Sequence, residues 1–86
     1  MTDLSGKVAL ITGAGQGVGQ GIAFALSAAG ASVVLAGRTL DKVQKTAEEI
    51  AQRGGKAIAV ACNVKSADDL ANAVETAVNE LGGLDI

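Results

Sequence analysis

Residues 8–21 read VALITGAGQGVGQG, a short apolar run followed at once by five glycines between positions 13 and 21. The run Val8–Thr12 has the length and the unbroken apolar character of a buried parallel strand. A helical stripe of apolar residues begins near Gly17, so the glycines occupy the turn between a strand and a helix. Unpaired N–H groups and the positive end of a helix dipole favour an anion there, and glycine lets the backbone approach it closely. The segment therefore predicts a phosphate-binding loop.

The spacing of the glycines decides which kind of loop is expected. A GxGxxG pattern does not fit, whereas GxxxGxG fits as Gly13/Gly17/Gly19 and again as Gly15/Gly19/Gly21. We favour the first register because Gly13 directly follows the last residue of the strand. In that register Gly13 makes the sharp turn, Gly17 admits a pyrophosphate and Gly19 allows close packing of helix on strand. No Gly-Lys-Ser/Thr follows, which excludes a Walker loop. The alternative is a tight turn that binds nothing, for which one or two glycines would suffice.

The alternation of strand and helix continues along the chain. Short apolar runs predict strands at Ser32–Ala36 and Ala57–Ala61, and Leu84–Ile86 predicts the start of a fourth strand. Ser66 is predicted to cap the third helix in a capping box that Asp69 closes. The order predicts an α/β fold, a Rossmann-like doubly wound parallel sheet of which the chain supplies three βα units and the start of the fourth strand. The predicted core positions of the three helices are Val18, Ile22, Ala25, Leu26 and Ala29; Leu40, Val43, Ala47, Ile50 and Ala51; and Leu70, Ala73, Val74, Ala77, Val78 and Leu81.

Composition excludes several classes of protein. The 86 residues include no His and no Tyr, so the chain cannot build a Ser-His-Asp triad, a histidine metal site or a phenolic acid–base group. A single cysteine, Cys62, excludes an internal disulfide and indicates a reducing compartment; we expect it to be buried rather than nucleophilic. The net charge of −2 has the wrong sign for a nucleic-acid binder, and no apolar run of about 18–20 residues predicts a membrane span. We expect a cytoplasmic protein without a metal site.

The segment Thr12–Gly19, TGAGQGVG, resembles the TGxxxGxG cofactor motif of the short-chain dehydrogenase/reductases. The lead-in Leu4–Ile11, the pair Gly37-Arg38, the segment Cys62–Val64 and the closing Gly83–Ile86 look like the same family, so the resemblance covers the whole chain. It implies an NAD(P)(H)-dependent oxidoreductase that transfers a hydride between nicotinamide and a small alcohol or ketone. The residues that it assigns to cofactor binding are Gly13, Gly15, Gln16, Gly17, Val18, Gly19, Arg38, Asn63 and Val64.

The end of the second strand bears on which nicotinamide cofactor is used. An acidic residue there would accept hydrogen bonds from the ribose hydroxyls and repel a 2′-phosphate. This chain instead has Gly37, which leaves room for the phosphate, and Arg38, whose guanidinium can clamp it. NADP(H) is therefore favoured. NAD(H) stays open, because many NADP-preferring members carry a second basic residue where this chain has Gln16.

At the end of the third strand the family commonly has Asp-Val, whose carboxylate accepts the adenine amino proton while the next N–H bonds a ring nitrogen. This chain has Asn63-Val64. The Asn63 amide oxygen can accept the same proton, and the backbone of Val64 is unaffected by the change. The alternative is that Asn63 is simply a loop residue that follows a strand.

The family's catalytic Ser, Tyr, Lys and Asn have no counterpart in these residues, so no catalytic residue is assigned. We expect residues 1–86 to form the N-terminal part of a single dinucleotide-binding domain, with the catalytic half absent from this chain and the full-length protein a homodimer or homotetramer. Two alternatives remain open, a dinucleotide-binding module without turnover and an engineered fragment. The substrate itself is not indicated by this sequence.

Overall fold

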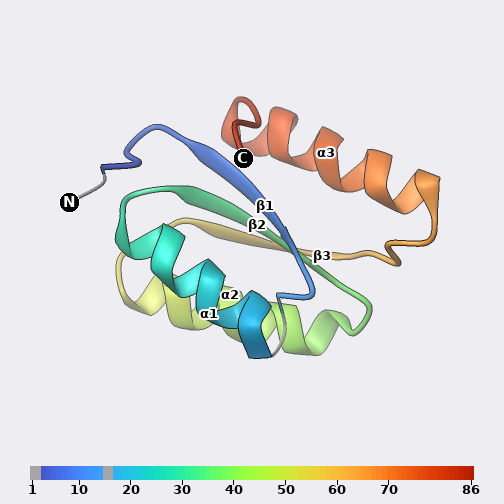
Figure 1. The fold of residues 1–86 in the computed structure, drawn as a ribbon, viewed down its shortest axis with the longest axis horizontal. Helices are drawn as coiled ribbons and strands as arrows, with labels where there is room; N and C mark the ends of the chain where they lie inside the picture. Colours follow the sequence, from blue (N-terminus) through green and yellow to red (C-terminus); the bar gives the residue numbers. More distant parts are fainter. Residues whose placement is uncertain (1–2, 15–16) are drawn as a thin grey trace.

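The computed structural model describes residues 3–14 and 17–86. The predicted alternation is confirmed, and β2 extends one residue further than expected. The elements follow in the order β1 (Val8–Thr12), α1 (Gly17–Ala28), β2 (Ser32–Gly37), α2 (Leu40–Gln52), β3 (Ala57–Ala61) and α3 (Ala67–Leu81) (Figure 1).

The three strands form one parallel sheet in the order β1-β2-β3, with Val8 opposite Ser32 and Val33 opposite Ala57. Helices α1 and α2 cover one face of the sheet and α3 covers the other (Figure 1). Successive residues of the central strand enter opposite cores: Leu35 packs with α1 and α2, and Val34 packs with α3. Because both faces are covered, the strands are apolar along their length rather than alternating.

The predicted start of a fourth strand lies beside β1. The Ile86 N–H donates to the Val8 carbonyl over 3.1 Å, and the Leu10 N–H donates to the Ile86 carbonyl over 3.0 Å. Ile86 therefore bonds through its N–H and its carbonyl to two residues of β1 that lie two positions apart. This is the hydrogen-bond pattern of two parallel strands. The Asp85 carboxylate also accepts the Val8 N–H, at 2.9 Å. Residues 84–86 are not themselves a strand, and the sheet of the structure has the order β1-β2-β3, but these bonds place the end of the chain alongside β1.

The predicted core face of α1 is wrong in part. Val18 and Ile22 are exposed, at 80% and 46%, whereas Ala23 is fully buried. Gly19 and Ala23 lie four residues apart, so the helix presents a face of small residues to the sheet. This face allows the close approach that the glycine turn requires, and the bulkier Val18 and Ile22 are turned outward.

The same preference for small residues appears in α3. Ala73 and Ala77, four residues apart, are fully buried against the sheet, while Val74 and Val78 are 39% and 48% exposed. In α2 the predicted Val43 and Ile50 are buried, but the polar Thr46 joins them there, and Leu40 and Ala51 are exposed. The Thr46 hydroxyl is satisfied because it donates to the Lys42 carbonyl and accepts from the Gln20 amide of α1. None of the helices in residues 3–14 and 17–86 has the length and apolar character needed to cross a membrane.

Candidate functional site

The candidate site lies at the carboxyl end of the parallel sheet, where β1 leads into α1. Gly13 and Gly17 both adopt left-handed backbone conformations, with φ of +65° and +60°. Glycine adopts this region without steric cost, whereas other residues rarely do. Apart from the chain neighbours of each glycine, no atom of residues 3–14 and 17–86 lies within 4 Å of the position that a Cβ would take on either residue. Val18 is exposed beside them at the start of α1, and Gly15 and Gln16 lie outside the described residues.

Gly19 provides the close packing that the favoured register requires. A Cβ built on Gly19 would lie 2.7 Å from the Gly13 carbonyl carbon and closer still to its oxygen. Only glycine therefore fits where α1 crosses the end of β1. In the competing register Gly21 would hold the packing position, yet a Cβ on Gly21 would meet nothing within 4 Å. The steric requirement for glycine in α1 thus falls on Gly19 and not on Gly21.

The end of β2 lies next to this turn. The Ala14 N–H donates to the Ala36 carbonyl over 3.3 Å, which ties the glycine turn to β2. Arg38 follows β2, is exposed, and has no hydrogen-bond or ion-pair partner within the described part of the chain. Gly37 has a structural role of its own, because a Cβ there would lie 2.7 Å from a methyl carbon of Val43 in α2. Its small size is thus required by packing, whichever cofactor is bound.

The loop between β3 and α3 brings Asn63 and Val64 to the same edge of the sheet. The Cys62 N–H donates to the Gly37 carbonyl over 2.8 Å, which fixes this loop beside the end of β2. Both Asn63 and Val64 are exposed. Arg38, Asn63 and Val64 therefore reach the carboxyl edge together, as the carboxyl ends of neighbouring parallel strands do.

The cap of α3 differs in one bond from the predicted capping box. Ser66 caps the helix as expected, since its hydroxyl accepts the Asp69 N–H at 3.2 Å. The Asp69 carboxylate, however, accepts the Asn63 N–H at 2.9 Å rather than that of Ser66. The reason is that the Ser66 N–H is already donated to the Asn63 carbonyl over 2.8 Å. Asp69 thereby holds the loop that carries two candidate site residues, a role that the sequence spacing did not indicate.

Cys62 is buried, as expected, at 2% exposure. Burial raises the pKa of its thiol, and the negative charge of Asp69 raises that pKa further. A thiol whose pKa is raised carries little thiolate at neutral pH and is a poor nucleophile. Cys62 therefore fills space beneath the candidate site.

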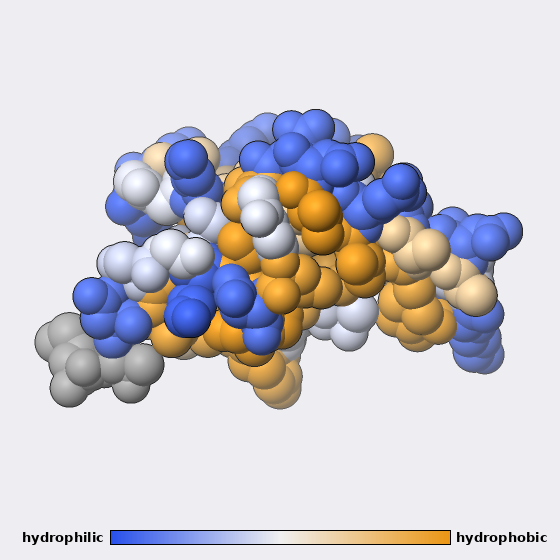
Figure 2. Space-filling model, turned by 90° about the horizontal axis from the view of Figure 1, so that it is seen from above, coloured by the Kyte–Doolittle hydropathy of each residue, from blue (hydrophilic) through white to orange (hydrophobic). Residues whose placement is uncertain are grey.

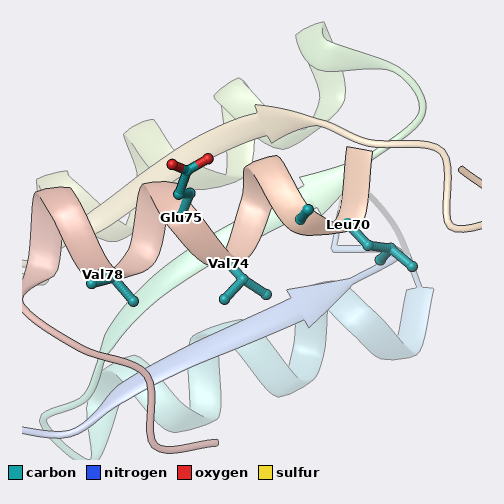
Figure 3. A pocket seen from close by; sticks show the side chains of 5 residues that line it. Leu70, Val74, Glu75 and Val78 are labelled. Atoms are coloured by element: carbon teal, nitrogen blue, oxygen red, sulfur yellow. The ribbon is translucent and has the colours of Figure 1, made fainter. Parts of the chain in front are cut away.

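A hollow in the surface lies along α3. Figure 3 shows Leu70, Val74 and Val78 directed to one side of the helix, with Glu75 on another side. Apolar surface is also visible on the side of the molecule seen in Figure 2, between hydrophilic patches. The hollow is lined mainly by hydrocarbon and offers no cation for a phosphate, so it does not compete with the carboxyl edge as a dinucleotide site.

Comparison with known proteins agrees with the arrangement at the carboxyl edge. The family model described as short chain dehydrogenase matches residues 7–86. The chain belongs to this family of oxidoreductases. A 7alpha-hydroxysteroid dehydrogenase of Escherichia coli is 42% identical over 83 residues, which cover 96% of this chain and 32% of that protein. An uncharacterized oxidoreductase of Staphylococcus aureus is 42% identical over 86 residues, which cover 100% of this chain and 36% of that protein.

A solved structure has the same fold over the whole of the matched region. A 7 alpha-hydroxysteroid dehydrogenase complexed with NADH and 7-oxo glycochenodeoxycholic acid matches with a TM-score of 0.94 and 41% identity, covering 96% of this chain and 32% of the other. The expected fold class and family are thus confirmed. The chain spans about a third of the length of the curated relatives it matches, at 32% and 36%.

Proposed function

We propose that this chain binds the adenosine and pyrophosphate portion of a nicotinamide dinucleotide at the carboxyl edge of its sheet. The observation that carries the proposal is the contact of Gly19 with the Gly13 carbonyl group. It brings the N-terminus of α1 over the end of β1, where free N–H groups and the helix dipole favour a pyrophosphate. Among the described residues, nothing apart from chain neighbours lies within 4 Å of a Cβ position on Gly13 or Gly17, which is compatible with a pyrophosphate held there. Val18 lies exposed beside them, and Gly15 and Gln16 complete the proposed loop in the sequence.

The preferred form of the cofactor is proposed to be NADP(H). Arg38 is exposed and without a partner in the described residues, at the end of β2 where the adenosine ribose would lie. A free guanidinium can hold a 2′-phosphate through paired, charge-assisted hydrogen bonds. NAD(H) is the second candidate, because a relative of known structure is described as complexed with NADH.

The protein's activity is proposed to be the oxidation of an alcohol or the reduction of a ketone. The nicotinamide would supply or receive the hydride when bound. The residues of this chain would bind and orient the dinucleotide and hold it at the edge of the sheet. With no Tyr or His, the 86 residues are expected to show no turnover by themselves. The matched relatives are about three times as long, which fits an N-terminal part of one dinucleotide-binding domain. A binding module without turnover is the alternative.

The binding proposal is tested by titrating the chain with NADPH and with NADH in a calorimeter. Arg38→Ala should weaken NADPH binding by about tenfold, the value of one charge-assisted hydrogen bond, and leave NADH binding unchanged. Lys45→Ala, which removes the same charge from an exposed position of α2, is the matched control and should change neither affinity. Equal loss of both nucleotides in Arg38→Ala, or loss of neither, would refute the phosphate clamp. Failure of the parent chain to bind either nucleotide would refute the site.

A further inference from the structure

Thr46 of α2 is the one buried polar side chain in residues 3–14 and 17–86, and it has no exposed surface. Its hydroxyl donates to the Lys42 carbonyl of the preceding turn over 3.2 Å and accepts a hydrogen bond from the Gln20 side-chain amide of α1, also over 3.2 Å. Burying a hydroxyl is costly unless such bonds replace those that it makes with water. These two hydrogen bonds, called the α1–α2 bridge below, therefore stabilise Thr46 in the interior and join two helices.

The α1–α2 bridge joins the two helices that begin at the two ends of the proposed site. Gln20 directly follows Gly19 near the start of α1, where the pyrophosphate is proposed to bind. Helix α2 begins at Leu40, two residues after Arg38, which is proposed to hold the phosphate on the ribose. Figure 1 shows α1 and α2 together on one face of the sheet, and the bond between Gln20 and Thr46 connects them there. The bridge is thus a direct side-chain connection between the two helices whose starts flank the site.

The packing of α1 on the sheet leaves part of its position to be fixed by other contacts. The helix turns Gly19 and Ala23 toward the sheet. Side chains this small form no ridge that fits into a groove, and such ridges are what fix the angle of a packed helix. The contact of Gly19 with Gly13 limits the approach of α1 at one point and leaves rotation about that point open. The α1–α2 bridge acts next to that point, and the Arg53 guanidinium over the Phe24 ring, 4.4 Å from its centroid, acts further along α1.

We propose that Gln20 and Thr46 are positioning residues, which set the place of the glycine loop relative to Arg38. The inference rests on the proposed dinucleotide function. A dinucleotide would contact the glycine loop and Arg38 at once, so it binds most tightly when their spacing is already correct before binding. Without the α1–α2 bridge, α1 would occupy a wider range of positions, and the dinucleotide would have to order them. A smaller ligand that contacts only the Arg38 end would not bear that cost.

Three substitutions separate this positioning role from the general stability of the helix. Thr46→Val removes the α1–α2 bridge and keeps nearly the same side-chain shape, so it should weaken NADPH binding by about threefold to tenfold, the range of one hydrogen bond. Thr46→Ser keeps the hydroxyl and should retain the affinity for NADPH. Thr76→Val is the matched control, because the Thr76 hydroxyl donates to the Asn72 carbonyl of the preceding turn in α3 over 2.8 Å and makes no bond to another helix within the described residues. It should leave NADPH binding unchanged.

The experiment measures the affinities of NADPH and of adenosine 2′-phosphate for the parent chain and these variants, by calorimetric titration well below each melting temperature. Adenosine 2′-phosphate carries the phosphate proposed for Arg38 and has no pyrophosphate. We expect the NADPH affinity to fall by about threefold to tenfold in Thr46→Val alone, and the affinity for adenosine 2′-phosphate to stay within about twofold of the parent in every variant. A loss of stability alone would weaken the binding of both ligands to the same extent, so the difference between the two ligands reports on positioning.

The outcomes distinguish the inference from the function on which it rests. An unchanged NADPH affinity in Thr46→Val, an equal loss for both ligands, or the same loss in Thr46→Ser or Thr76→Val would overturn the positioning role alone. A parent chain that binds NADPH but not adenosine 2′-phosphate would also overturn it, because the two ends of the site would then not bind independently. A parent chain that does not bind NADPH would overturn the proposed function together with the inference.

Discussion

Gly19 and Gly21 lie two residues apart in α1, and the structure predicts that replacing them with alanine has opposite effects on stability. A Cβ on Gly19 would lie 2.7 Å from the Gly13 carbonyl carbon, and backbone atoms cannot yield as a flexible side chain can. Overpacking of this kind costs about 1–3 kcal/mol. A Cβ on Gly21 meets nothing within 4 Å, so Gly21→Ala should only gain the helix propensity of alanine, about 1 kcal/mol. The two variants should therefore differ by about 2–4 kcal/mol in the free energy of unfolding.

The assay is thermal and urea unfolding followed by circular dichroism, which suits a chain with no Trp and no Tyr. At this chain length, each kcal/mol corresponds to about 4–8 °C in Tm, so Gly19→Ala should melt at least about 4 °C below the parent. Gly21→Ala should melt above the parent. The same samples should show that NADPH binding falls in Gly19→Ala and is retained in Gly21→Ala. A Gly19→Ala variant as stable as the parent, or a Gly21→Ala variant equally destabilised, would refute the proposed packing of α1 on the turn.

Three further predictions concern the strand ends and the cap of α3. Gly37→Ala should lower the free energy of unfolding by about 1–2 kcal/mol, because its Cβ would lie 2.7 Å from a methyl carbon of Val43. Adding Val43→Ala should cancel part of that loss. If the effects of the two substitutions on the free energy of unfolding in urea were strictly additive, the contact would be contradicted. Burial raises the pKa of the Cys62 thiol above its ordinary value of 9.0, so stability should fall as the pH rises past 9.0, where the unfolded thiol ionises and the folded one does not. Cys62→Ala should abolish that decline. The prediction would be contradicted if the stability of the parent depended on pH above 9.0 in the same way as the stability of Cys62→Ala. Ser66→Ala should lower stability by about 1 kcal/mol through loss of the helix cap, and an unchanged urea midpoint would exclude the cap bond.

Strand positions in this protein could be predicted from short apolar runs because every strand is covered on both faces. Helix faces were harder, and α1 shows why. Val18 and Ile22 have the spacing and hydrophobicity of core residues, but the sheet receives Gly19 and Ala23 instead. A hydropathy pattern assigns large apolar side chains to the buried face of a helix, whereas a helix that must approach the sheet closely turns its small residues toward the sheet. Hydrophobic periodicity therefore located α1 correctly but placed the wrong residues of its first turns against the sheet, whereas the predicted Leu26 does pack against the core.

The candidate site was predicted as a set of positions, and its hydrogen bonds were not predicted. The left-handed turn at Gly13 and the close packing at Gly19 agree with the predicted spacing, because strand ends and left-handed turns impose strict steric requirements. The partner of Asp69 could not be read in the same way. A capping box predicts that its carboxylate returns to Ser66, but the Asn63 carbonyl has already taken the Ser66 N–H. Such competition among neighbouring donors and acceptors depends on the path of the loop, which residue spacing does not specify.

The end of β2 holds the parts of the candidate site together. The glycine turn is bonded to it through Ala14 and Ala36, and the β3–α3 loop through Cys62 and Gly37. Because both bonds use backbone atoms, they place the two loops without engaging the Arg38 side chain. Within residues 3–14 and 17–86 the Arg38 side chain and the Val64 N–H have no partner, while the segments that carry them are fixed to one buried strand. Rigid support with unengaged donors lowers the ordering cost of binding, which is the physical reason to expect that the adenosine portion of a dinucleotide binds to these residues.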